Sequence, residues 1–387
     1  MISISNVAQK IEPSLTRQLF NMAKEYNDVI DFTLGDPDIH PHNNIKQAGC
    51  NAIMQGKTRY SQNAGLQELR NAICSHYLRS ESLKYNPLTE VIVTVGAMEG
   101  LYLTLLSILN PGDEVIIPAP YWINYKQMVL LCHATPIIVD SNEDGDLTFS
   151  VEAIKRAITP KTKAIILNNP SNPSGLIISQ EKIASLAKLC VEQNLIVLSD
   201  EVYKTLIYDN NQYKSIVTYP GMRERTVLIN SFSKEFCMTG WRIGYILAPQ
   251  ELISVMIKLQ ENVVACAPLP SQYAAMEALK GASSYSKNMV REFTERRKVL
   301  IEGIKKIPHL SCNSPQGTFY AMINIKETGL TSEEFAYTLL REVQVAVVPG
   351  ITYGICCEGY VRIAFTLEVD KIKEGLHRLS SFMQKYN

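Results

Sequence analysis

The sequence of 387 residues has no excess of charge of either sign, because 38 lysines and arginines balance 38 aspartates and glutamates. Nucleic acids and anionic membranes select a basic surface, so neither is expected as the main partner. No run of eighteen apolar residues is present that could span a membrane. The first residues also lack the basic start and apolar stretch of a secretory signal, and we therefore expect a cytoplasmic protein.

Cysteine and histidine patterns that hold metals are missing too. The nine cysteines are dispersed without a CxxC pair, and the six histidines form no HExxH or zinc-finger spacing, so no metal site is expected. Cys356 and Cys357 are adjacent, and we interpret them as core or loop residues rather than a redox switch. A scattered, odd-numbered set is typical of reduced thiols in the core of an intracellular protein.

Hydrophobic residues make up 46% of the chain, and its middle part alternates short β-branched runs with helical stretches. The predicted strands span residues 91–95, 114–118, 136–140, 164–168, 195–200 and 226–230. Continuous apolar strands separated by helices are typical of a parallel sheet buried on both faces. The spacing thus predicts an α/β protein with a mostly parallel central sheet.

The pattern changes after about residue 275, where a charged helix (291–305), a strand (319–324), a helix (333–342) and a further strand (360–365) are predicted. We expect a large domain over residues 46–275 and a smaller α+β domain over residues 276–387. Residues 1–45 are expected to form an N-terminal arm and part of the small domain. Ligands of parallel sheets bind beyond the carboxyl ends of the strands, where this chain has Gly96 and the polar segments 168–175, 200–203 and 231–234.

Lys234 comes directly after a predicted strand, and Arg242 follows eight residues later. The stretch 231–245 resembles the cofactor-lysine signature of class I aminotransferases, which have the fold of type I pyridoxal-phosphate-dependent transferases. The resemblance implies that Lys234 carries pyridoxal 5'-phosphate as a Schiff base. It also implies transfer of an amino group from an L-amino acid to a 2-oxo acid such as 2-oxoglutarate.

Further matches lie at the neighbouring strand ends. Asn172 belongs to an Asn-Pro-Ser-Gly loop that is similar to the family's Asn-Pro-Thr-Gly loop, and residues 200–203 resemble the strand end that follows it. By this resemblance Asp200 pairs with the ring nitrogen, which keeps the ring protonated and able to accept electrons. Asn172 and Tyr203 both hydrogen-bond the ring oxygen. Lys234, Asp200 and Tyr203 are therefore the predicted catalytic residues.

The resemblance also implies a phosphate cup and a ring-stacking residue. Backbone N–H groups after the strand 91–95 and hydroxyl and guanidinium groups near the lysine bind phosphate well. Trp122 lies in a segment similar to the one that covers the cofactor ring, and Tyr60 matches a tyrosine that reaches the phosphate of the neighbouring subunit. The expected cofactor contacts beyond Lys234, Asp200, Tyr203 and Asn172 are thus Gly96, Ala97, Met98, Trp122, Ser231, Ser233, Arg242 and Tyr60.

Arg362, in the apolar strand 360–365, matches the family's arginine for the substrate α-carboxylate. Gly35, Trp122 and Asn172 are the other expected substrate contacts. No second arginine falls in a motif for the substrate side chain, so tyrosines, asparagine and backbone groups are expected there. The position of Tyr60 implies a homodimer with shared active sites.

The resemblance covers nearly the whole chain. Within the family, the sequence is most similar to bacterial aminotransferase A and aspartate aminotransferase-like proteins. It leaves aspartate-like, aromatic and N-acetyl-diaminopimelate donors open. A carbon–sulfur β-lyase on the same fold is the main alternative, although residues 238–242 favour transfer. A regulator fused to a DNA-binding domain would need a winged helix ahead of the motifs, which begin near residue 35, and is not expected.

Overall fold

The computed structural model describes residues 2–141 and 147–386. A seven-stranded sheet occupies the middle of the chain in the order β2-β8-β7-β6-β5-β3-β4. The strands are β2 (Val91–Thr94), β3 (Glu114–Pro118), β4 (Thr135–Val139), β5 (Thr162–Asn168), β6 (Ile196–Asp200), β7 (Thr226–Ser231) and β8 (Gly244–Leu247). Every pairing is parallel except those of β8. The predicted mostly parallel α/β sheet is confirmed, and β8 is the one strand of this sheet that the sequence pattern missed.

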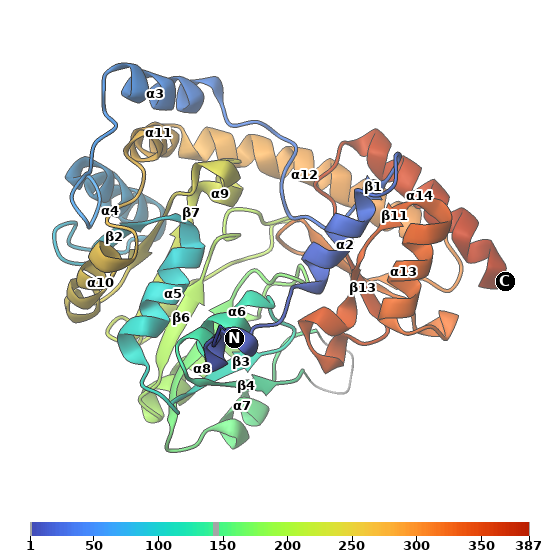
Figure 1. Cartoon of the computed structure of the whole chain (residues 1–387), viewed down its shortest axis with the longest axis horizontal. Helices are drawn as coiled ribbons and strands as arrows, with labels where there is room; N and C mark the ends of the chain where they lie inside the picture. Colours follow the sequence, from blue (N-terminus) through green and yellow to red (C-terminus); the bar gives the residue numbers. More distant parts are fainter. Residues whose placement is uncertain (1, 142–146, 387) are drawn as a thin grey trace.

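Helices cover both faces of this sheet, which explains its continuous apolar strands. On one face, Leu101 and Met256 pack with alternate strand residues, and on the other face Ile154 and Leu186 do so. These helices are α5 (Gly96–Ile108), α6 (Asn124–Leu131), α10 (Gln250–Val263), α7 (Val151–Ala157) and α8 (Gln180–Glu192). Figure 1 shows α3 (Asn43–Met54), α4 (Gln67–Glu81) and α11 (Leu269–Lys280) grouped beyond the β2 edge.

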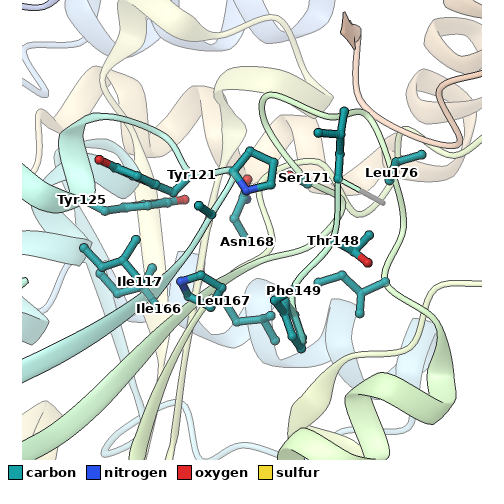
Figure 2. A pocket seen from close by; sticks show the side chains of 15 residues that line it. Ile117, Tyr121, Tyr125, Thr148, Phe149, Ile166, Leu167, Asn168, Ser171 and Leu176 are labelled. Atoms are coloured by element: carbon teal, nitrogen blue, oxygen red, sulfur yellow. The ribbon is translucent and has the colours of Figure 1, made fainter. Parts of the chain in front are cut away.

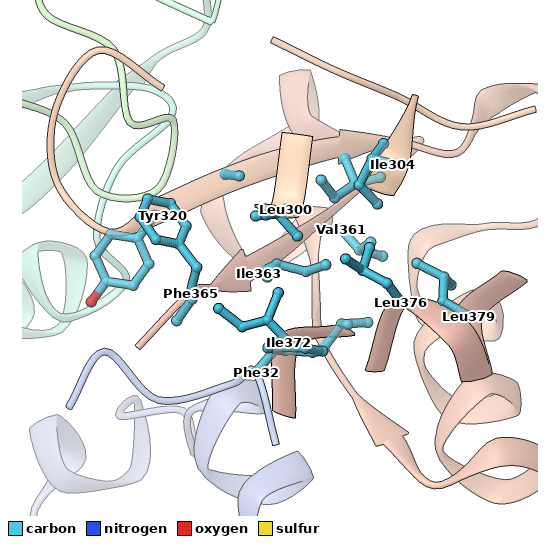
Figure 3. Packing of buried hydrophobic residues seen from close by; sticks show 14 of the residues in the cluster. Phe32, Leu300, Ile304, Tyr320, Val361, Ile363, Phe365, Ile372, Leu376 and Leu379 are labelled. Atoms are coloured by element: carbon cyan, nitrogen blue, oxygen red, sulfur yellow. The ribbon is translucent and has the colours of Figure 1, made fainter. Parts of the chain in front are cut away.

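A second, antiparallel sheet has the order β12-β13-β10-β9. Its strands are β9 (Ser311–Cys312), β10 (Tyr320–Asn324), β12 (Val348–Pro349) and β13 (Tyr360–Ala364). Apolar side chains of this sheet pack against α12 (Ala282–Ile304), α13 (Ser332–Val343) and α14 (Val369–Met383), as Figure 3 shows for Ile363, Leu300 and Ile372. Helix α12 includes most of the helix predicted at residues 291–305 but begins earlier, at Ala282.

The N-terminal segment lies among C-terminal elements. β1 (Ile30–Asp31) pairs in parallel with β11 (Val345–Ala346), and α2 (Leu15–Ala23) packs beside them through Leu19. Figure 1 shows these blue N-terminal elements beside the orange and red end of the chain. We propose to keep the division into an arm, a large domain and a small domain, with the second boundary moved from residue 275, inside α11, to Gly281.

The nine cysteines are all free, and four of them, Cys74, Cys132, Cys190 and Cys357, are buried. Cys50 is exposed, so the expectation that all nine are core residues is wrong. None of the described helices is both long enough and apolar enough to cross a membrane.

Candidate active site

A cavity of about 420 Å³ lies at the carboxyl ends of β5, β6 and β7. This is the edge where a parallel sheet collects its ligand-binding residues. Most of the predicted site residues line it: Gly35, Ala97, Met98, Trp122, Asn172, Asp200, Tyr203, Ser231, Ser233, Lys234, Arg242 and Arg362. The cavity therefore brings together predicted residues from Gly35 near the start of the chain to Arg362 near its end.

Two predicted residues are not among those that line the cavity. Gly96 lies behind Arg242, and a Cβ atom on Gly96 would be 2.7 Å from Nη2 of that arginine. Its backbone also has φ +75°, so glycine at this position allows the guanidinium to approach the start of α5. Tyr60 is the second, and its side chain is 87% exposed.

Asp200 is the last residue of β6 and is 3% exposed. The Tyr125 hydroxyl donates a hydrogen bond of 2.6 Å to Oδ2 of Asp200, and the backbone N–H of Val202 donates to Oδ1. Burial raises the pKa of Asp200 to about 6, while these two hydrogen bonds oppose the rise. A buried carboxylate of this kind is suited to a cationic partner in the cavity.

The loop after β5 is joined to the end of β6. The Asn168 side chain donates to the carbonyl of Asp200 at 3.1 Å and accepts from the Asn172 N–H at 2.8 Å. Asn168 and Asp200 are also direct partners in the sheet register. The position of Asn172 over the cavity therefore depends on the pairing of β5 with β6.

Lys234 lies in the short helix α9 (Phe232–Glu235), which begins where β7 ends. Its Nζ donates to the carbonyl oxygen of Gly35 at 2.6 Å, so the amine points across the cavity to the N-terminal segment. The Ser231 hydroxyl accepts from the Ser233 N–H at 3.2 Å, and Arg242 Nη1 donates to the Thr239 carbonyl at 2.9 Å. Together with the first N–H groups of α5, these cationic and hydroxyl groups form a cup for an anion.

Arg362 lies in β13 and is 3% exposed. Nη1 donates to Oδ1 of Asn172 at 3.0 Å, Nη2 donates to the carbonyl of Thr33, and Nε is buried without a hydrogen-bond partner in the structure. No carboxylate among residues 2–141 and 147–386 forms an ion pair with Arg362. A buried cation with an unsatisfied donor is costly unless an anionic ligand binds to it.

Several cavity residues were not predicted from the sequence, namely Arg17, Thr33, Tyr320 and Tyr353. Arg17 is a further arginine at this cavity, in addition to Arg242 and Arg362. Its guanidinium lies 5.1 Å from the centre of the Phe20 ring, and the described residues offer it no ion pair. The sequence carried no motif for these residues, because the packing of the N-terminal segment on the second sheet brings them to the cavity.

A smaller cavity of about 30 Å³ lies behind Tyr125. Figure 2 shows Tyr121 and Tyr125 on one side of it, with Phe149 and Leu167 across from them. It has room for about one water molecule and is lined mainly by apolar side chains. The cavity that is lined by Asp200, Lys234 and Arg362 is therefore the candidate active site.

Known proteins resemble the chain over nearly its whole length. The family described as aminotransferase class I and II matches residues 27–379. The chain is 37% identical over 386 residues to an aspartate aminotransferase of Pyrococcus abyssi, with 99% of each chain covered. It is 34% identical over 386 residues to aromatic-amino-acid aminotransferase 2 of Thermococcus litoralis, again with 99% of each covered. The solved structure of the Thermus thermophilus aspartate aminotransferase with maleate is 33% identical and superposes with a TM-score of 0.93, covering 98% of this chain and 100% of that one.

Asp200→Asn should stabilise the protein stripped of bound small molecules, by an amount that grows between about pH 4 and pH 6. Because the folded-state pKa of Asp200 is raised, the charged carboxylate lowers the free energy of unfolding. This loss of stability is complete above about pH 6 and absent below the ordinary pKa near 4. The gain should be at most about 3 kcal/mol, measured as a rise in Tm at pH 8 that disappears at pH 4. Asp370→Asn, at a side chain that is 93% exposed, is the control and should show no such dependence. An equal effect of Asp200→Asn at both pH values would contradict the burial argument.

Proposed function

The chain belongs to the class I and II aminotransferases and is a pyridoxal-phosphate-dependent enzyme, and on this premise we propose its substrates, assembly and catalytic residues. The proposed reaction moves the amino group of an L-amino acid to a 2-oxo acid such as 2-oxoglutarate, in a cytoplasmic homodimer. The single observation that carries the proposal is the buried Arg362, which has no ion-pair partner among the described residues and faces the same cavity as Lys234. Arg362 supplies the planar fork of donors that a substrate carboxylate needs.

The residues of the cavity fit the cofactor. Lys234 Nζ is available for covalent attachment, and buried Asp200 offers its carboxylate to the ring nitrogen. Arg242, Ser231, Ser233 and the N-terminal amides of α5 would hold the phosphate, with Gly96 leaving room for the Arg242 guanidinium. When bound, the cofactor supplies an electron-accepting ring that weakens the bonds at the substrate Cα.

The side chains of this protein would do the rest. Arg362 binds the α-carboxylate and thereby fixes the direction in which the Cα–H bond points. With the cofactor bound, the free Lys234 amine would be the base that removes the proton from the substrate Cα. Asp200 would hold a positive charge on the ring nitrogen, and Tyr203 and Asn172 would donate to the ring oxygen.

Arg17 supports a substrate class. In the proposed site, each of three cations has a partner: the cofactor carbonyl for Lys234, the phosphate for Arg242 and the α-carboxylate for Arg362. Arg17 remains as a further cation that lines the cavity. A dicarboxylic side chain would complement this charge. We therefore propose that the donors include aspartate-like amino acids, and that aromatic donors bind without using Arg17.

The proposed reaction is tested by a screen of amino donors against 2-oxoglutarate with the purified protein. Glutamate should form with at least one dicarboxylic donor. Release of pyruvate and a thiol from a cystathionine-type substrate, without glutamate formation from any donor, would instead identify the carbon–sulfur β-lyase.

Borohydride reduction of the purified protein should attach a pyridoxyl group to Lys234 and to no other lysine. Peptide mass mapping should find a single modified peptide, which contains Lys234. The yellow absorbance of the protein should disappear on reduction. Lys234→Arg keeps the charge but cannot form the bond, and should give no labelled peptide. A label on another lysine would show that the attachment residue is misassigned.

Arg362→Lys should lower kcat/KM for every donor, by an amount that corresponds to ~2–4 kcal/mol of lost transition-state stabilisation. The reason is that an ammonium group cannot form two parallel hydrogen bonds to a carboxylate. Arg17→Gln should lower kcat/KM for aspartate-like donors by about tenfold and change aromatic donors by less than about twofold. Steady-state kinetics with one donor of each class separates the two arginines. If Arg362→Lys impairs only dicarboxylic donors, the proposed substrate orientation is reversed.

Tyr60 supports the proposed shared site, because it is 87% exposed in one chain and lies near other exposed apolar residues such as Met54 in sequence. An inactive Lys234→Ala protein mixed with an inactive Tyr60→Ala protein should recover activity in hybrid dimers, since one of the two sites then has both residues. Activity is measured after subunit exchange has been shown with tagged chains. Exchange without recovery would count against the contribution of Tyr60 to the neighbouring subunit.

A further inference from the structure

Tyr320, the first residue of β10, stands where the two sheets meet and is 3% exposed. Figure 3 shows its hydroxyl pointing out of the apolar cluster of the second sheet, toward the ribbons of the seven-stranded sheet. There its oxygen lies 3.2 Å from the hydroxyl oxygen of Tyr203, which follows β6. This hydrogen bond joins elements from the two sheets across the cavity.

The same side chain contacts the substrate arginine and the N-terminal segment. The Arg362 guanidinium carbon lies 4.4 Å from the centre of the Tyr320 ring. A Cβ atom on Gly35 would lie 1.7 Å from the Tyr320 hydroxyl oxygen, so the backbone of Gly35 packs directly on this hydroxyl. The carbonyl of Gly35 in turn accepts from Lys234 Nζ. Tyr320 therefore contacts Tyr203 and Arg362 directly and reaches Lys234 through Gly35. The proposed function assigns these three residues to the cofactor ring oxygen, the substrate carboxylate and the covalent bond to the cofactor.

We propose that Tyr320 is a positioning residue with two separable contacts: its hydroxyl donates to Tyr203, and its ring supports the Arg362 guanidinium. This inference rests on the proposed function, in which Tyr203 gives its one proton to the ring oxygen of the cofactor. Tyr203 can then only accept from Tyr320, so Tyr320 is the donor in the loaded enzyme. An accepted hydrogen bond makes Tyr203 a stronger donor in turn, because consecutive hydrogen bonds polarise one another.

Burial supports this arrangement. Tyr203 is 4% exposed, and burial holds its pKa well above the ordinary value, so its proton stays on the oxygen. Tyr353 provides a comparison within the same site. Its ring also faces Arg362, at 5.0 Å from the guanidinium carbon, but its hydroxyl has no hydrogen bond to Tyr203.

The hydroxyl is tested by pH titration of the visible absorbance of the holoenzyme. The proton held between the Lys234 nitrogen and the ring oxygen is released at lower pH when Tyr203 donates to that oxygen. Tyr203→Phe should therefore move the midpoint upward, and Tyr320→Phe should move it in the same direction by a smaller amount, about 0.3–1 pH unit. In the double variant Tyr320→Phe should add nothing, because its effect passes through Tyr203. Tyr353→Phe should leave the midpoint unchanged.

The ring is tested by steady-state kinetics. Tyr320→Phe keeps the ring and should lower kcat while changing KM for the amino acid and the oxo acid by less than about twofold. Tyr320→Leu removes the ring and should raise both KM values by at least about fivefold, since Arg362 loses its aromatic support. If Tyr320→Leu does not fold, Tyr320→Met removes the ring with a side chain that adapts to the gap.

The outcomes separate the inference from the function on which it rests. No shift with Tyr203→Phe would remove the assigned role of Tyr203 and with it the proposed cofactor contacts. A shift with Tyr203→Phe but none with Tyr320→Phe would overturn the hydroxyl contact alone. Equal, additive shifts in the double variant would also overturn it, and unchanged KM values without the ring would overturn the support of Arg362.

Discussion

The buried Arg362 guanidinium is the constraint on which the arrangement of the site depends. It belongs to the second sheet, yet its hydrogen bonds run to Asn172 in the loop after β5 and to Thr33 in the N-terminal segment. In the described ranges it has no carboxylate partner, and Nε remains unsatisfied. Three separate parts of the chain thus converge on one cation that only an anionic ligand can complete. This arrangement supports the proposal that Arg362 binds a substrate carboxylate.

Asp200 has the opposite charge and a corresponding need. Its carboxylate is buried at the end of β6, and the Tyr125 hydroxyl offsets only part of the desolvation cost. A cationic ring nitrogen would remove the remaining cost, while a neutral ligand would not. We therefore propose that Arg362 and Asp200 bind the two oppositely charged ends of the ligand, and that both reduce the stability of the protein when no ligand is bound. This exchange of stability for binding is typical of active sites.

The sequence was sufficient for features that depend on local pattern. Continuous apolar strands predicted the parallel sheet, and the residues after them, such as Asp200 and Lys234, were found where the strands end. It was not sufficient for β8, which follows Arg242 without an intervening helix and pairs antiparallel with both neighbours. It also missed Arg17 and Tyr320, because the pairing of β1 with β11 and the packing of the two sheets bring them to the cavity. Such contacts between distant segments leave no periodicity or spacing in one sequence.

The position of Tyr320 shows why these long-range contacts matter for function. Tyr203 follows β6 of the seven-stranded sheet and Arg362 lies in β13 of the four-stranded sheet, so in the proposed site a relative movement of the sheets would misalign the cofactor and the substrate. The hydroxyl and ring of Tyr320 contact one residue from each group, and its close packing on Gly35 adds the segment that meets Lys234. Reactions at a bound carbon lose rate steeply when the reacting groups shift by an ångström. We therefore propose that this single aromatic side chain at the junction keeps the proposed substrate-binding and cofactor-binding groups aligned.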